Sequence, residues 1–318
     1  LSSRCWLPVT RYLGLSLEYF ATAPTAKMTK KDTLLQERIF SGYSGDTNGP
    51  LLYPDGEPRF RMVYFNGGGA ARHGASLKVE GRTTMRNYIA NGGSYVGSCA
   101  GAFLSSAGAL GKDGQIHHTD CYLGIWPGHT LSTALSDSRT GLTLDAKSPL
   151  LKYDDFGGDH RVDSVYHNNG CYALTDSAWP KETEVLLRYD TEGRELKRDI
   201  NKQAGIWAYK ANEYAGRVIA CGSHPEGNSS GERLDLMCAM VRYALDGNGN
   251  AVEIQISTAG TITADLADPN LLYWTFEKTS NYNNRPAYYI RNVFIRVIIT
   301  LMLSVLFAVM MKKLHDLI

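Results

Sequence analysis

Short apolar runs alternate with longer amphipathic stretches between residues 61 and 245. The apolar runs lie between glycine-rich or polar turn segments, and their length predicts buried β-strands. We expect strands over residues 61–65, 94–98, 162–168, 183–190, 203–210 and 216–223. The amphipathic stretches predict helices over residues 77–93, 100–110 and 230–245. This order predicts an α/β fold whose central sheet is mostly parallel and is covered by helices on both faces.

The first twenty residues allow two interpretations. Residues 1–14 are basic and contain serine, which is typical of a transit peptide and would make the protein mitochondrial. Residues 9–20 have the pattern of an amphipathic first helix. We favour the helix, so that one domain extends over residues 1–246.

The other end of the chain predicts a membrane anchor. Residues 297–311 contain no charged side chain, and basic residues flank them at Arg291 and Arg296 and at Lys312 and Lys313. An apolar segment with basic ends is typical of a membrane span. We therefore predict a single anchor helix over 293–311, joined to the domain by a connector over 247–292. The alternative is a buried or partner-binding helix.

Composition and charge narrow the classes of function. The chain has 318 residues and a net charge of +1, with 33 basic and 32 acidic residues. No basic field marks it as a nucleic-acid binder, so we expect no nucleic-acid partner. Six cysteines are scattered without a Cys-x-x-Cys pair, which is typical of reduced thiols. His-His-Thr-Asp at 117–120 lacks a second cluster with ligand spacing, so we predict no metal and no cofactor.

Cys99 carries the clearest chemical signal. It is the centre of Gly-Ser-Cys-Ala-Gly, at the predicted junction of a strand and a helix. A glycine two residues before and two residues after the central residue is typical of a nucleophile elbow, because strand and helix approach closely there. Gly97 and Gly101 occupy those positions. The pattern predicts a nucleophilic cysteine, and its alternative is a buried core thiol.

Two further segments supply the groups that a nucleophilic cysteine needs. The N–H of Ala100 and an N–H of the loop 66–69, from Gly67 or Gly68, are candidate oxyanion donors. The sequence His-Pro-Glu after the last predicted strand supplies a candidate base, His224, with a carboxylate two residues later, Glu226. A solvated turn is the alternative for His-Pro-Glu, but its coincidence with an elbow and a glycine loop favours a catalytic site.

The motifs together resemble a known superfamily. In chain order, Phe-Asn-Gly-Gly-Gly at 65–69, the elbow at 93–103, Val-Tyr-His-Asn-Asn-Gly at 165–170 and His-Pro-Glu at 224–226 resemble the class I glutamine amidotransferase-like superfamily. The branch that they resemble is named for the amino-terminal domain of certain biotin-protein ligases. The resemblance covers residues 5–246 and implies a flavodoxin-like three-layer sandwich with a triad of Cys99, His224 and Glu226. It also implies that His167, Asn168 and Asn169 line the pocket.

Departures from this superfamily lead to two functional hypotheses. The chain begins close to the expected first helix, so we expect the family's first strand to be missing, and Asn66 stands where amidotransferases typically have proline. No segment has the size of a synthetase or ligase domain. The first hypothesis is a membrane-anchored cysteine hydrolase or amidotransferase-like enzyme that acts on a small amide. The second is a catalytically inactive homologue that serves as a structural or interaction subunit of a membrane protein complex.

Overall fold

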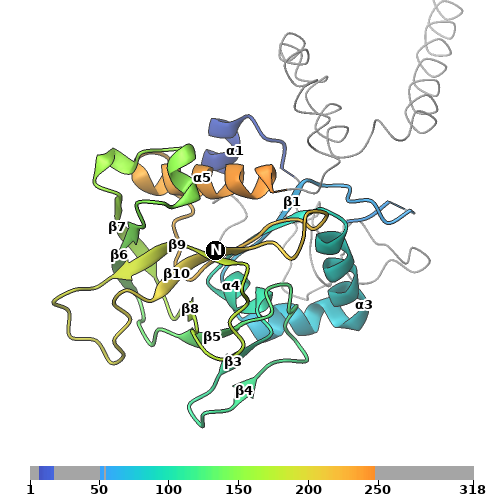
Figure 1. The fold of residues 1–318 in the computed structure, drawn as a ribbon, viewed down its shortest axis with the longest axis horizontal. Coiled ribbons are helices and arrows are strands. Elements are labelled where there is room, and N and C mark those ends of the chain that lie inside the picture. The colour runs from blue at the N-terminus through green and yellow to red at the C-terminus, as the bar shows by residue number, and fades with distance from the viewer. Residues whose placement is uncertain (1–6, 18–50, 54, 248–318) are drawn as a thin grey trace, which may run out of the picture.

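The computed structural model describes residues 7–17, 51–53 and 55–247 (Figure 1). The described helices are α1 (Leu7–Leu13), α3 (Ala70–Ala90), α4 (Ala100–Ser105) and α5 (Glu232–Asp246). The strands are β1 (Met62–Phe65), β2 (Ser94–Ser98), β3 (Gly108–Leu110), β4 (Ile116–His117), β5 (His129–Ser132), β6 (Ser138–Leu144), β7 (Arg161–His167), β8 (Cys171–Ala173), β9 (Thr183–Asp190), β10 (Ala204–Tyr209) and β11 (Val218–Cys221). Two 3-10 turns, Pro149–Lys152 and Phe156–Gly158, lie between β6 and β7.

The strands form one mixed sheet with the order β1-β2-β11-β10-β8-β5-β3-β4. The core strands β1, β2 and β11 are parallel, as predicted. Strand β10 runs antiparallel to β11, β8 and β9, and β9 also pairs with β6, which pairs with β7. Strands β9, β10 and β11 follow one another without an intervening helix, and parallel pairing needs such a crossover. The α/β class is confirmed, and the sheet outside its parallel core is mixed.

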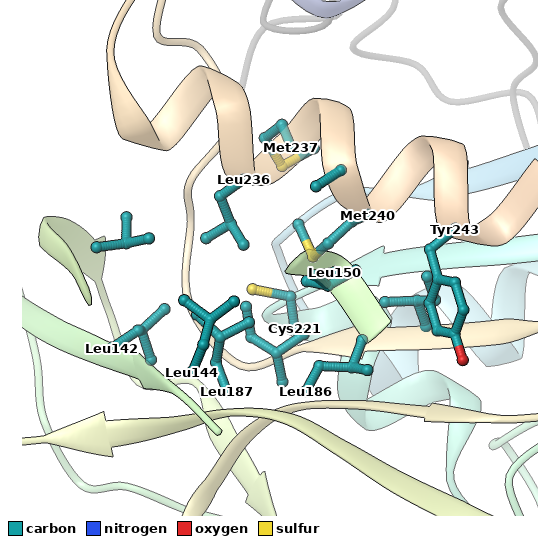
Figure 2. Packing of buried hydrophobic residues seen from close by; sticks show 14 of the residues in the cluster. Leu142, Leu144, Leu150, Leu186, Leu187, Cys221, Leu236, Met237, Met240 and Tyr243 are labelled. Carbon is teal, nitrogen blue, oxygen red and sulfur yellow. The ribbon is translucent and has the colours of Figure 1, made fainter. Parts of the chain in front are cut away.

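Hydrophobic side chains form one cluster on each face of the sheet. Figure 2 shows the cluster under α5, where helix side chains face strand side chains; its labelled members are Leu142, Leu144, Leu150, Leu186, Leu187, Cys221, Leu236, Met237, Met240 and Tyr243. The other cluster includes Leu77 and Met85 of α3 and Leu104 of α4. In β2, Tyr95 belongs to this second cluster and Val96 to the first. Such alternation shows that the strand is buried on both faces.

The boundaries of several elements differ from the predicted ones. The helix expected over 100–110 ends at Ser105, because Ser106 is extended and its hydroxyl bonds to the Phe103 carbonyl, and residues 108–110 form β3. The helix expected over 77–93 begins at Ala70 and is interrupted at Lys78, where φ is 57°.

The predictions for the two ends of the chain fall largely on undescribed residues. Part of the helix expected over 9–20 is present as α1, which ends at Leu13; α1 contacts α5 and buries Val9 in the cluster under that helix. Among the described helices, none is long and apolar enough to cross a membrane. The predicted anchor over 293–311 and all but the first residue of the predicted connector over 247–292 lie outside the described residues.

Candidate active site

Cys99 lies in the sharp turn between β2 and α4. Its backbone has φ 49° and ψ −103°, and its N–H donates a 2.8 Å hydrogen bond to the carbonyl of Cys221 on β11. Positive φ at a non-glycine residue is strained and is enriched at functional turns. A Cβ on Gly97 would lie 2.6 Å from the carbonyl carbon of Gly101, and a Cβ on Gly101 would lie 2.2 Å from the carbonyl oxygen of Phe65. Neither glycine leaves room for a side chain in this strand-to-helix turn.

His224 and Glu226 follow β11, directly beside the turn that holds Cys99. In the parallel ladder between β2 and β11, Ser98 lies opposite Cys221, so the segments after both strands leave the sheet at the same edge. Nδ1 of His224 and Oε1 of Glu226 are 2.7 Å apart, and their side chains are 7% and 0% exposed. The N–H of His224 donates a 2.8 Å hydrogen bond to the Tyr166 carbonyl, which fixes the backbone at this histidine.

The electrostatic surroundings favour a protonated His224. Burial of the imidazole lowers its pKa, but the interactions with the Cys99 side chain and with the Glu226 carboxylate outweigh burial and raise the pKa to about 9. At neutral pH the imidazole therefore carries a proton on each nitrogen. One N–H is directed to Glu226, and the side chain also contacts Cys99.

Two hydroxyl groups extend the hydrogen-bond chain beyond Glu226. Ser98 Oγ donates to Glu226 Oε1 at 3.0 Å, and the Tyr64 hydroxyl lies 2.5 Å from Ser98 Oγ. Since the Ser98 proton is directed to the carboxylate, Tyr64 is the donor to Ser98. Sequence reasoning missed both residues. A signal for Ser98 was its place next to the nucleophile in a buried strand, where a hydroxyl needs a partner.

The candidate oxyanion donors have different surroundings. Gly68 lines the same pocket as Cys99 and has φ 142°, which few residues other than glycine adopt. Ala100 is the first residue of α4, so its N–H has no acceptor within that helix. The backbone of Gly67 hydrogen-bonds to His73, and Gly67 does not line the pocket. His73, which sequence reasoning missed, thus restrains the glycine loop from α3.

Cys99 opens into a pocket with a volume of about 540 Å³. Its wall is formed by the start of α3, by α4 and β3, and by the loop between β7 and β8. The lining residues are Gly68, Gly69, Ala70, Ala71, Arg72, Cys99, Phe103, Ala109, Leu110, His118, Tyr122, Ser132, Asn168 and Asn169. A cavity of this size accommodates a small organic molecule.

The three residues predicted for the pocket wall separate into two groups. Asn168 and Asn169 line the pocket, and the Asn168 carbonyl oxygen lies 3.6 Å from Cys99 Sγ. His167 is 0% exposed and bonds to Thr133 and Ser223 through its two ring nitrogens. Burial, with the nearby His224, lowers the pKa of His167 to about 4. His167 is therefore a neutral histidine behind the pocket rather than in its wall.

The His-His-Thr-Asp segment is not assembled as a metal site. His117 bonds to Asp113, whereas His118 stacks on Tyr122 and lines the pocket. Within residues 7–17, 51–53 and 55–247, no group of three or more His, Cys, Asp or Glu side chains is placed to hold a metal ion.

The mixed sheet with its parallel core and the cysteine turn after β2 define an α/β domain. The model of the family described as "Biotin-protein ligase, N terminal" matches residues 56–235, more than half of the chain, and the chain belongs to this family. A search of curated proteins gave no match.

The solved structures that match this chain share little sequence with it. A glutamine amidotransferase is 15% identical, with a TM-score of 0.41, over 77% of this chain and 93% of that chain. A thua-like protein from Bacteroides uniformis ATCC 8492 is 15% identical, with a TM-score of 0.40, over 64% of this chain and 78% of that chain. A thua-like protein from Parabacteroides merdae ATCC 43184 is 14% identical, with a TM-score of 0.39, over 77% and 85% of the two chains.

Proposed function

We propose that this protein is a cysteine-dependent amide hydrolase or amidotransferase-like enzyme whose nucleophile is Cys99. One observation carries the proposal: a buried His224 is bonded to Glu226 at 2.7 Å and contacts the side chain of Cys99, which opens into a pocket. A nucleophile with a base that a third group orients is the arrangement required for acyl transfer.

In the first half of the proposed reaction, the Cys99 sulfur attacks the carbonyl carbon of the amide and a carbon–sulfur bond forms. The carbonyl oxygen becomes an oxyanion, which the N–H groups of Ala100 and Gly68 stabilise. The His224 imidazolium gives its proton to the amide nitrogen, the carbon–nitrogen bond breaks, and ammonia or an amine leaves. The product on the enzyme is a thioester of Cys99.

In the second half, water replaces the amine. Neutral His224 takes a proton from the water as its oxygen attacks the thioester carbon, and the carbon–sulfur bond then breaks. The acid leaves, and the imidazolium and the thiolate are restored. Glu226 orients the ring and stabilises its charge throughout, while Ser98 and Tyr64 hold the carboxylate.

Selective alkylation tests the nucleophile. We expect iodoacetamide at pH 7 to label Cys99 about tenfold or more faster than a free cysteine, because cysteines paired with a protonated histidine are typical reactive nucleophiles. Peptide mass spectrometry measures labelling at each cysteine of the full-length chain. Cys238 is the internal control, because burial raises the pKa of its thiol to about 11 and should keep its labelling slow.

If Cys99 were labelled no faster than a free thiol, the proposal of an enzyme would be contradicted. The result would favour the second hypothesis, a catalytically inactive homologue that serves as an interaction subunit. The Cys99→Ala variant identifies the labelled peptide. It should leave the slow labelling of Cys238 unchanged.

We also propose that residues 293–311 attach the protein to a membrane, on the support of their sequence alone. The full-length chain is then expected to remain with membranes during extraction with alkaline carbonate. A chain that lacks residues 293–318 should move to the supernatant. Release of the full-length chain by carbonate would contradict the anchor.

A further inference from the structure

We infer that the pocket selects amides with a net negative charge, and that Arg72 is the residue that recognises the charge. The inference rests on the proposed function, since it names the substrate class of the same site. It starts from the Arg72 guanidinium, which is the one arginine or lysine side chain among the described lining residues. No carboxylate among the described residues forms an ion pair with Arg72, so the guanidinium is free to bind an acidic group of a ligand.

The wall around Arg72 adds hydrogen-bond donors. Gly69, Ala70 and Ala71 line the pocket at the beginning of α3, and Gly69 is the N-cap residue and has no side chain that could cap the helix. The first N–H groups of a helix have no acceptor within it and carry partial positive charge. Arg72 lies in this same first turn of α3. Its side chain and the N–H groups of the turn therefore attract an anion to the same end of the pocket.

Apart from the reacting Cys99 sulfur, which His224 faces, no described lining residue offsets this charge. Asn168, Asn169 and Ser132 contribute neutral polar groups, and the described part of the wall contains no acidic side chain. An ammonium group of a ligand would therefore meet positive potential near Arg72. A zwitterion such as glutamine gains less in this field than an amide that carries a carboxylate alone.

The pocket is small enough for one ligand to reach both Arg72 and Cys99. A sphere of 540 Å³ is about 10 Å across, which is close to the Debye length of about 8 Å at physiological ionic strength. A charge at Arg72 is thus felt at the sulfur, and a chain of a few carbon atoms spans the distance. The substrate class is a short amide with a carboxylate or another acidic group a few bonds from the scissile carbonyl.

The first test compares two alkylating reagents that differ in charge. Iodoacetate is anionic and iodoacetamide is neutral, and both react with the thiolate, so the ratio of their rates at Cys99 is independent of the thiolate fraction. We expect Arg72→Gln to lower the iodoacetate-to-iodoacetamide ratio about three- to tenfold at low salt, and Arg72→Lys to retain most of the ratio. Adding 0.5 M NaCl, roughly enough to shorten the Debye length to about 4 Å, should bring the wild-type ratio close to that of Arg72→Gln.

Lys147→Gln is the matched control, because it removes one exposed positive charge outside the pocket. It should leave the ratio unchanged. An Arg72→Gln ratio equal to that of wild type would overturn the inference. Slow labelling of Cys99 by both reagents, with a ratio that still depends on Arg72, would instead contradict the proposed catalysis and leave the charge preference standing.

The second test measures binding without chemistry. The full-length Cys99→Ala variant is titrated calorimetrically with succinamate and with its neutral isostere succinamide, and then with N-acetylglutamine and glutamine. We expect the anionic member of each pair to bind about three- to tenfold more tightly, and a further Arg72→Gln substitution to remove the difference. Equal affinities within both pairs would overturn the inference. If only N-acetylglutamine and glutamine bound with equal affinity, the pocket would recognise a carboxylate but would not select for net negative charge, and that part of the inference would be overturned.

Discussion

Gly101→Ala is expected to lower the free energy of unfolding by about 3 kcal/mol or more, because overpacking against backbone cannot be relieved by a rotamer change. A Cβ at this position would lie 2.2 Å from the carbonyl oxygen of Phe65 and 3.0 Å from its carbonyl carbon. Either α4 or β1 must move, and β1 is hydrogen-bonded to β2 over its whole length. Urea denaturation monitored by circular dichroism measures the change.

Gly193→Ala is the control for this substitution. Gly193 has φ 73°, and a Cβ there would have no atom within 4 Å. The control therefore carries only the backbone cost of a positive φ, about 1 kcal/mol. If both variants were destabilised equally, the close packing of α4 against β1 would not be the reason for glycine at position 101.

Glu226→Gln is expected to lower the pKa of His224 from about 9 to between about 6 and 8, because the carboxylate charge is lost while burial remains. The pKa is measured by NMR titration of the ring. In wild type, the proton on His224 stabilises the fold below the unfolded-state pKa of about 6.5, and this stabilisation is lost as pH rises through about 9. The Glu226→Gln variant should lose this stabilisation of the fold at a lower pH than wild type.

The same variant tests the proposed role of the imidazolium. If turnover needs a protonated His224 as the acid, the high-pH limit of amide hydrolysis moves down with the pKa, and the rate at pH 8 falls about two- to hundredfold as the protonated fraction of the ring falls. Glu192→Gln removes an exposed carboxylate elsewhere and should change neither measurement. An unchanged His224 pKa in Glu226→Gln would contradict the assignment of Glu226 as its partner.

Local motifs predicted the parts of the site that one short segment determines. Gly97, Cys99 and Gly101 belong to a single turn, and their spacing predicts the turn directly. His224 and Glu226 are two residues apart, and the position of their segment after an apolar strand predicts the sheet edge where they lie. The core strands β1, β2 and β11 were predictable for the same reason, since each is a short apolar run between turn residues.

The missed features depend on contacts between distant segments. Tyr64 and Ser98 are 34 residues apart and Ser98 and Glu226 are 128 apart, so no local pattern links them. His167 was expected in the pocket wall because it belongs to the same motif as Asn168 and Asn169. The pairing of β7 with β6 and the hydrogen bond to Ser223 instead place its ring in the core.

Strand β6 reads Ser-Arg-Thr-Gly-Leu-Thr-Leu, which begins polar and contains glycine, and its extended form depends on β7 and β9 as neighbours. This dependence on neighbouring strands explains why β6 was not predicted, whereas the more apolar runs of β7, β9 and β10 were.

The register between β2 and β11 sets the distance between the side chains of the candidate triad. The sulfur is carried by the residue after β2, and the imidazole and carboxylate are carried by the segment after β11; the two strands pair over four positions, from Val218 opposite Tyr95 to Cys221 opposite Ser98. A slip of one residue would displace one side of the site by about 3.3 Å, more than a hydrogen bond tolerates. Insertions within either strand should therefore lower activity far more than insertions in the exposed turn at 192–195. Only an insertion in β2 or β11 shifts the register between these two strands.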